Sequence, residues 1–282
     1  QAQVLLKALA GLHSAPTPME SDCKAEECLE VAKKAALLAG EEIRVAWPKK
    51  GQEETKSSDI DLVTETDRRC EEIIIAHIKS RFPEHVIIGE ESAGSSKYTL
   101  TDAPTWTIDP IDGTTNFVHR LPMCCVLISF IQKKEPLVGV VYDPNADELF
   151  WAVKGKGAFL ESKGGQAMAI HVSTTTSIKK AVICTDPGYS RSELDVGRYT
   201  AVQAALLCTG IRNIRTIGST GLCLAYVACG RLDAGFEEGT WDLNKGPKIW
   251  DFAPGRLLVQ EAGGLTRDIG SGTSSTNALD LM

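Results

Sequence analysis

Two carboxylates, Asp109 and Asp112, lie three positions apart in the segment TWTIDPIDGTTNF, residues 105–117. Carboxylate oxygens bind hard cations, and the backbone N–H groups at the start of a helix bind phosphate. A pair of carboxylates beside a helix start is therefore suited to binding a cation and a phosphate together. Asp-Pro and Asp-Gly also form turns that do no chemistry, so this segment alone leaves both interpretations open.

The residues around this pair predict a turn from a strand into a helix. Residues 106–108 are typical of the end of a buried strand, and Pro110 predicts that a central strand does not continue. Gly113 after an Asp predicts a turn. Thr114 and Thr115 are favourable N-caps, so a short helix is expected to follow.

Further acidic residues occupy similar places. Glu90 follows the short apolar strand predicted at 86–89, and Asp67 opens a helix predicted over 67–80. Asp242 and Asp251 each follow a Trp. Asp67 could equally be a plain N-cap, and Glu90 part of a solvated strand edge.

The candidate metal ligands are Glu90, Asp109, Asp112 and one of Asp242 or Asp251. They include no His or Cys, which favours magnesium over zinc. Two such cations can activate a water, polarise a phosphate and neutralise the leaving oxygen, which is the two-metal route to phosphoester hydrolysis.

Composition excludes several other classes. The chain has 282 residues, 43% of them hydrophobic, and a net charge of −7, which argues against a general nucleic-acid binder. Its nine Cys form no C-x-x-C pair, so neither a zinc site nor a disulfide scaffold is indicated. Cys124 and Cys125 lie in an apolar run and are expected to be core thiols. No apolar run is long enough for a membrane helix, and a cytoplasmic location is predicted.

Hydrophobic periodicity predicts the surrounding elements. Apolar residues at helical spacing predict an amphipathic helix over 25–47. Strands at 123–131, 137–142 and 148–153, joined by short polar turns, predict an antiparallel meander. The later residues alternate between strands and helices, which predicts a second, partly parallel sheet. Its expected strands are 181–185, 214–217 and 232–236, with a possible last strand at 265–269, and its expected helices are 195–209, 221–229 and 252–262.

Four segments resemble the inositol monophosphatase family of metal-dependent phosphatases. Residues 105–117 match that family's pattern W-x-I-D-P-[IL]-D-G-[ST]-x-N-F, and WDFAPGRLLVQEAGG at 250–264 matches a second signature. KSSDIDLVTETD at 56–67 and GEES at 89–92 agree as well. The resemblance runs from about Met19 to the C-terminus.

The resemblance implies an α/β fold, an αβαβα layered sandwich with an antiparallel sheet and a second, mixed sheet. Residues 19–282 would form a single catalytic domain, and residues 1–18 a flexible leader without a function. The family usually continues from a similar D-L-M into a final strand and helix, so the chain is expected to be truncated after residues 280–282.

The resemblance also implies roles for individual residues. Glu90, Asp109 and the Ile111 carbonyl would hold one magnesium, and Asp109, Asp112 and Asp251 a second, with Glu90 near a third, weaker ion. Asp251 is preferred because only it has the family's distance to the Glu-Ala-Gly-Gly run, which leaves Asp242 in an insertion. Glu90, Thr114 and Asp67 would be catalytic, with Thr114 and Asp67 positioning or deprotonating the attacking water. The residues in contact with the substrate would be Ile111, Asp112, Gly113, Thr114, Gly218, Ser219, Thr220, Glu237 and Asp251.

The implied reaction is magnesium-dependent hydrolysis of myo-inositol monophosphate by water, with inhibition by lithium and a homodimeric enzyme. Other small phosphates remain alternatives, namely sugar or polyol phosphates, histidinol phosphate and 3′-phosphoadenosine nucleotides. A truncated, non-catalytic isoform that acts as a dimer partner is an alternative of another class.

Overall fold

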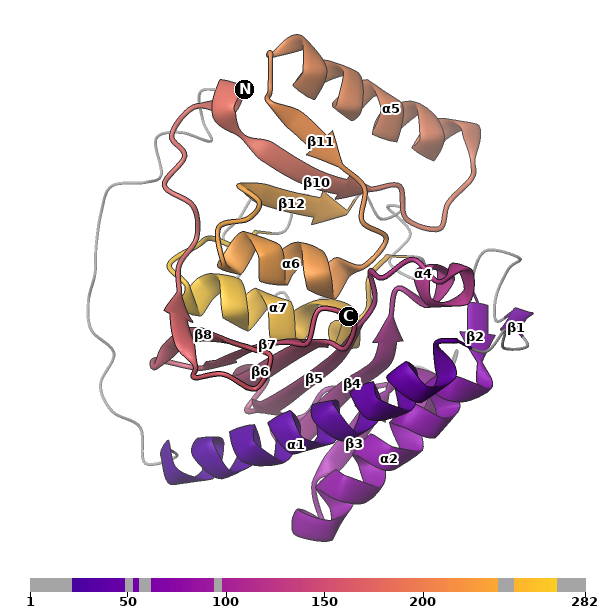
Figure 1. Ribbon diagram of the computed structural model, residues 1–282, viewed down its shortest axis with the longest axis vertical. Helices are drawn as coiled ribbons and strands as arrows, with labels where there is room; N and C mark the ends of the chain where they lie inside the picture. The colour runs from indigo at the N-terminus through magenta and orange to yellow at the C-terminus, as the bar shows by residue number, and fades with distance from the viewer. Residues whose placement is uncertain (1–21, 49–52, 56–61, 94–97, 238–245, 268–282) are drawn as a thin grey trace.

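The helices and strands stack in five layers (Figure 1). The computed structural model describes residues 22–48, 53–55, 62–93, 98–237 and 246–267. The helices are α1 Asp22–Ala46, α2 Glu65–Arg81, α3 Glu90–Ala93, α4 Thr114–His119, α5 Glu193–Cys208, α6 Thr220–Ala228 and α7 Ile249–Glu261, with a 3-10 turn at Ile178–Lys180. The strands are β1 Glu53–Thr55, β2 Leu62–Thr64, β3 Val86–Gly89, β4 Thr105–Asp112, β5 Cys125–Gln132, β6 Glu135–Asp143, β7 Glu148–Val153, β8 Gly157–Ser162, β9 Met168–Ile170, β10 Val182–Asp186, β11 Asn213–Arg215 and β12 Ala234–Glu237.

The large sheet has the order β3-β4-β5-β6-β7-β8-β9. From β4 onward every pairing is antiparallel, which confirms the predicted meander. The sheet is mixed, because β3 pairs with β4 in parallel. The three described strands of the small sheet, β11-β10-β12, are all parallel. The mixed sheet is therefore the large one, whereas the family resemblance implied that the second sheet would be mixed.

One face of the large sheet is covered by α1 and α2 (Figure 1). The buried face of α1 repeats small residues at helical spacing, so the helix backbone can approach the sheet closely. This confirms the predicted helix, and its buried residues include Ala25, Cys28, Leu29, Ala32, Ala35, Ala36, Ala39 and Ile43. From α2, Ile74 and Ile78 complete this apolar layer.

The other face of the large sheet packs against α6 and α7, which lie between the two sheets (Figure 1). Leu127 of β5, Leu222 of α6 and Leu258 of α7 are fully buried there. At the crossing of α7 and β6 the backbones nearly touch, because a Cβ atom on Gly139 would lie 2.7 Å from the Pro254 carbonyl oxygen. Only glycine fits at this crossing, which fixes the position of α7.

Three sequence predictions were wrong in detail. Strand β4 does not stop at Pro110 but continues to Asp112, because a bulge accommodates the proline. Asp109 pairs with Leu127 and Asp112 with Cys125, so Pro110 and Ile111 together oppose one residue of β5. Helix α2 begins two residues before Asp67, and α4 is preceded by Gly113 at its N-cap, not by Thr114 or Thr115. The left-handed backbone of Gly113, with φ of 90°, turns the chain into α4.

Several other predictions have definite outcomes. Residues 265–267 form no strand. The leader 1–18, Asp242 and the chain end at 280–282 lie outside the described residues. The described cysteines are all free thiols, and Cys124 and Cys125 are fully buried as expected. None of the described helices is both long enough and apolar enough to cross a membrane.

Candidate active site

The bulge in β4 brings Asp109 and Asp112 to the same face of the large sheet. Side chains three positions apart on a regular strand point to opposite faces, and one inserted residue cancels that alternation. The pairing partners Leu127 and Cys125 both face the layer of α6 and α7. Asp109 is 2% exposed and Asp112 9% exposed, so two carboxylates are buried beside each other.

Asp112 is held by the start of α6. Its Oδ2 accepts hydrogen bonds from Ser219 Oγ and the Gly221 amide, both at 2.6 Å, and its Oδ1 accepts one from the Thr220 amide at 3.3 Å. The thiol of Cys125 donates to the same Oδ2 at 3.5 Å. Ser219 is 2% exposed, so its hydroxyl orients Asp112 and caps α6.

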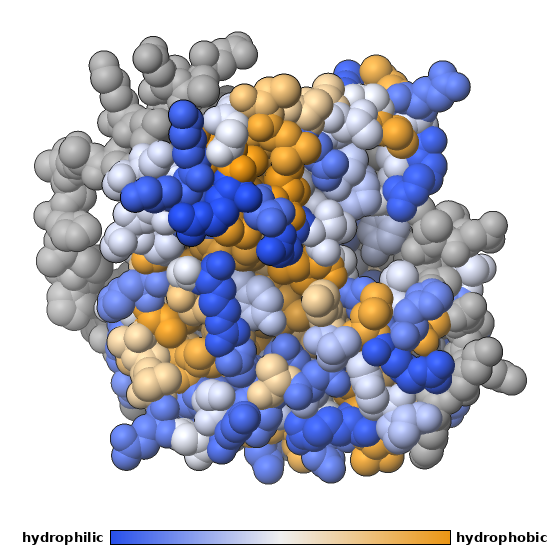
Figure 2. Space-filling view, turned by 45° about the horizontal axis from the view of Figure 1, so that its top comes forward, coloured by the Kyte–Doolittle hydropathy of each residue, from blue (hydrophilic) through white to orange (hydrophobic). Residues whose placement is uncertain are grey.

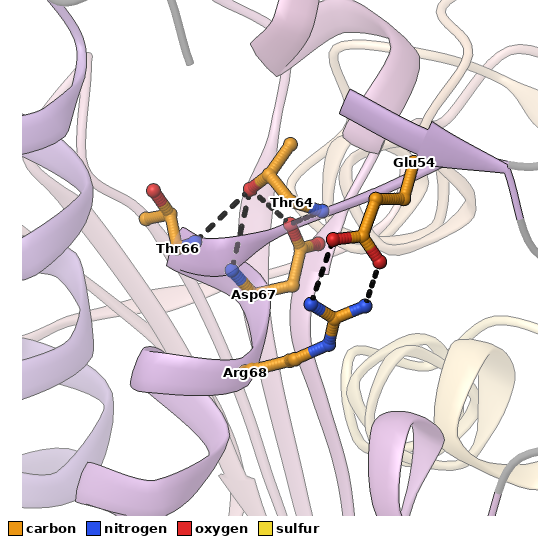
Figure 3. A network of polar contacts seen from close by, with 5 residues as sticks. All are labelled: Glu54, Thr64, Thr66, Asp67 and Arg68. Carbon is orange, nitrogen blue, oxygen red and sulfur yellow. Dashed lines mark hydrogen bonds and ion pairs between the residues drawn. The ribbon is translucent and has the colours of Figure 1, made fainter. Parts of the chain in front are cut away.

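Asp67 is held by the residue that begins α2 (Figure 3). Thr64 is the N-cap, and Asp67 Oδ2 accepts from the Thr64 amide at 2.9 Å in a capping box. The other oxygen, Oδ1, lies 3.3 Å from Thr114 Oγ1. The predicted pairing of Asp67 with Thr114 is therefore present, although Asp67 is the third residue of its helix rather than its cap. Figure 3 also shows Arg68 and Glu54 in a forked ion pair beside it.

Asp251 and Glu90 also lie at helix starts. Asp251 is the third residue of α7, and its Oδ2 accepts from the Lys248 amide at 2.5 Å. Glu90 is the first residue of α3. The carboxylate of Glu71 accepts from the amides of Glu91 and Ser92, both at 2.8 Å, and so fixes that turn.

Three carboxyls of this cluster have a raised pKa. Burial is the main cause for Asp109, Asp112 and Asp251, and the charge of Glu90 adds to the shift at Asp109 and Asp251. The pKa of Asp112 rises to about 6, with the hydrogen bonds from α6 limiting its rise. Positive charge among these oxygens would relieve the repulsion, so the donor set fits a hard divalent cation.

The carboxylates are not yet directed at a common point. In the described part of the chain no three His, Cys, Asp or Glu side chains are arranged as a cation cage. Asp112 and Asp251 are instead turned toward the backbone amides named above. These side chains would have to rotate to share an ion.

The opposite side of the site is formed by Gly218, Thr220 and Glu237. The Thr220 hydroxyl donates to Glu237 Oε2 at 2.7 Å. Burial raises the pKa of Glu237 to about 7. The Gly218 amide donates to Asp186 Oδ1 at 2.9 Å. Asp186 and Glu237 lie in register at the ends of two parallel strands, β10 and β12.

Sequence reasoning assigned no role to three residues that organise the site. Asn116 is buried, and its amide nitrogen donates to the carbonyls of Met123 and Ile217, each at 2.8 Å, joining α4 to the start of α6. Glu71 and Asp186 both hold backbone amides beside site residues. Only Asn116 had a local signal, since it lies in the 105–117 motif.

The model of the inositol monophosphatase family matches residues 24–281. The chain belongs to this family.

Relatives and solved structures agree with that assignment. "Inositol monophosphatase 3" of Solanum lycopersicum is 45% identical over 251 residues, which cover 89% of each chain. "Inositol monophosphatase 2" of Homo sapiens is 38% identical over 258 residues, 91% of this chain and 84% of that one. A solved Thermotoga maritima IMPase has a TM-score of 0.71 at 32% identity and covers 86% of both chains. The predicted fold class is thereby confirmed.

The raised pKa values predict that magnesium stabilises the protein more at high pH than at low pH. An acid whose folded pKa is raised keeps its proton in the folded state after the unfolded chain has lost it, so metal-free stability falls as pH rises. For Asp112 that window runs from its ordinary value of 3.8 to about 6, and the pKa values of Asp109 and Asp251 are also raised, which shifts stability in the same direction. A bound cation replaces those protons.

Thermal melts with EDTA or with magnesium chloride at pH 5.5 and pH 8 measure this effect. We expect a clearly larger rise in Tm on adding magnesium at pH 8. Calcium chloride serves as a control for divalent charge, and sodium chloride for ionic strength. An equal rise in Tm at both pH values would contradict the prediction.

Proposed function

We propose that this chain hydrolyses myo-inositol monophosphate to inositol and phosphate with magnesium as cofactor. The observation that carries the proposal is that the carboxylates of Asp109, Asp112, Asp251 and Glu90 lie close enough to act on one another electrostatically, in a member of the inositol monophosphatase family. Oxygen-only ligands favour magnesium over zinc.

The proposed ligands are those implied by the family motifs. Glu90, Asp109 and the Ile111 carbonyl would hold one cation, and Asp109, Asp112 and Asp251 a second, with Glu90 beside a third. The Ile111 carbonyl lies 3.0 Å from the Thr114 hydroxyl, and a carbonyl oxygen has a second lone pair for a cation. When bound, the cations supply Lewis acidity and neutralise the charge of the phosphate and the leaving oxygen.

The chain's own residues would position and deprotonate water. The Thr114 hydroxyl has one proton and two acceptors within reach, Asp67 Oδ1 and the Ile111 carbonyl. By donating to Asp67, it turns a lone pair toward a water and can pass that water's proton to Asp67. The water oxygen attacks phosphorus as the bond from phosphorus to the inositol oxygen breaks, and the inositol oxygen takes up a proton.

The phosphate and the inositol ring would lie on different sides of the site. Helix α4 has no side-chain cap at its start, and we propose that the amides of Gly113 and Thr114 contact the phosphate. The amides at the start of α6 are already bonded to Asp112, Ser219 and Asp186. Gly218, Thr220 and Glu237 would therefore face the ring hydroxyls, with Ser219 holding Asp112 behind them.

Phosphate release from myo-inositol 1-phosphate tests the proposal. We expect release that requires magnesium, is lost with EDTA and falls on adding lithium. If a folded sample releases none, a panel of sugar and polyol phosphates, histidinol phosphate and a 3′-phosphoadenosine nucleotide follows. Release from one of these would assign another substrate, whereas no release from any would favour the non-catalytic isoform.

We also propose a homodimer in the cytoplasm, with residues 19–282 as one catalytic domain. Helix α5 supports an association between chains, because it has no buried residue and its Leu194 and Leu207 are 62% and 60% exposed. Apolar surface gathers toward the top of the view in Figure 2, where α5 comes forward. Light scattering after size exclusion measures the mass, and a mass of one chain would reject the dimer. Cell fractionation tests the location.

A further inference from the structure

The segment from Gly218 to Gly221 is held in place by side chains on several sides. Asn116 donates to the carbonyls of Ile217 and Gly218, at 2.8 and 3.3 Å. Asp112 accepts the amides at the start of α6, and Asp186 accepts the amide of Gly218. This segment joins the phosphate side of the site to the ring side.

Gly218 depends on these contacts for its orientation. Its φ is +72°, in the left-handed region, and glycine visits that region about as readily as the right-handed ones. The backbone of Gly218 therefore does not fix its own direction. The peptide plane between Ile217 and Gly218 is held at both edges, since Asn116 donates to the Ile217 carbonyl and Asp186 accepts from the Gly218 amide.

Asp186 is built into the small sheet and not into a loop. It ends β10, where it pairs in register with Glu237 at the end of β12. Its Oδ2 lies 3.6 Å from the thiol of the fully buried Cys184, which restrains the side chain. The carboxylate therefore connects the fixed sheet edge that carries Glu237 to the segment that carries Thr220.

We propose that Asp186 is a positioning residue that sets the affinity of the site for the organic part of the substrate. It does so by holding Gly218, so that Thr220 stays bonded to Glu237 and both face the ring hydroxyls. Its carboxylate bonds to Gly218, on the ring side of the proposed site. This inference rests on the proposed phosphatase function and adds a residue that sets specificity.

The two halves of the substrate can be measured separately in one assay. The KM for myo-inositol 1-phosphate reports on both halves, and the Ki of inorganic phosphate as a competitive inhibitor reports on the phosphate side alone. For Asp186→Ala we expect KM to rise about tenfold, because the hydrogen bond from the Gly218 amide to a charged acceptor is lost. The Ki of phosphate should stay within about twofold and kcat within about threefold. Asp186→Asn keeps an acceptor oxygen and should restore most of the affinity.

A matched control comes from the end of β6. Asp143 is also a buried carboxyl at a strand end, and it accepts the amides of Asn145 and Ala146 at 2.9 and 3.0 Å, neither of which is a proposed site residue. Asp143→Ala should lower Tm and leave the ratio of KM to Ki unchanged. If Asp186→Ala gives no cooperative melt, Asp186→Glu replaces it, since one added methylene displaces the carboxylate, and the same rise in the ratio is expected.

The outcomes separate this proposal from the proposed function. A wild-type chain that releases no phosphate from the inositol ester removes the function, and this inference with it. A wild type that turns over while Asp186→Ala, or its Glu replacement, changes KM and Ki equally or changes neither overturns the role of Asp186 alone. Failure of Asp186→Asn to restore KM would also overturn it.

Discussion

Asp109→Asn is expected to abolish phosphate release while leaving the fold intact. Asp109 is the proposed ligand shared by both cations, and the amide lacks the negative charge that holds them. We expect kcat to fall by at least about 10³-fold, as for loss of a central charge-stabilising group. The Asn side chain keeps an oxygen for the Ile111 amide, now 3.0 Å from Asp109 Oδ1, so the local turn should survive.

The same substitution should raise the stability of the metal-free protein at neutral pH. It removes a carboxyl group whose pKa is raised by burial and by neighbouring carboxylates, and which therefore lowers stability at neutral pH. The Tm in EDTA should therefore be higher than that of the wild type, and the rise in Tm on adding magnesium should shrink. Asp143→Asn, outside the site, should keep both the activity and the response to magnesium. Residual magnesium-dependent turnover within tenfold of wild type would reject the role of Asp109.

Gly139→Ala is expected to have the largest effect on stability. The new Cβ would lie 2.7 Å from the Pro254 carbonyl oxygen and 2.9 Å from its Cα, and these are backbone atoms that cannot rotate away. Helix α7 must shift from β6, which we expect to cost about 3 kcal/mol. For a domain of this size that corresponds to a fall in Tm of roughly 6–12 °C.

The shift should also reach the site, because α7 carries Asp251. Titration of Tm with magnesium should show weaker binding in Gly139→Ala than in wild type. Gly197→Ala is the matched control, since its Cβ would meet no atom within 4 Å in the exposed helix α5. That change should leave magnesium binding unaltered and raise stability by up to about 1 kcal/mol. A Tm for Gly139→Ala within 2 °C of the wild-type Tm would contradict the prediction, because it corresponds to a loss of at most about 1 kcal/mol in the free energy of unfolding.

Predictions from the sequence were correct where the residues of one continuous segment determine the structure of that segment. The helix over 25–47 and the antiparallel meander follow from apolar spacing and turn residues, and both are present in the structure. The Asp109–Asp112 pair was found from its types and spacing. The family motifs then gave the layered fold, which no periodicity could supply.

What could not be predicted depends on contacts between distant segments. Asp186 gains its role from Gly218, which lies 32 positions later in the chain. Asn116 gains its role from Ile217, which lies 101 positions later. No local pattern indicates either contact. The bulge at Pro110 was not predicted, because a proline was taken to end the strand. That rule holds for a strand with regular pairing, whereas a bulge lets the strand continue past the proline. Thr64 was missed as a cap because Asp67 is itself a favourable cap residue.

That bulge has a consequence for how the chain avoids misfolded alternatives. If β4 paired with β5 one residue out of step, Asp109 and Asp112 would face the opposite side of the sheet. That side is filled by the alanines and isoleucines of α1 and α2. Unpaired carboxylates in such surroundings cost several kcal/mol each, so a slipped strand would be rejected during folding. The residues proposed to bind the cations thus also select the correct strand register before any substrate is bound.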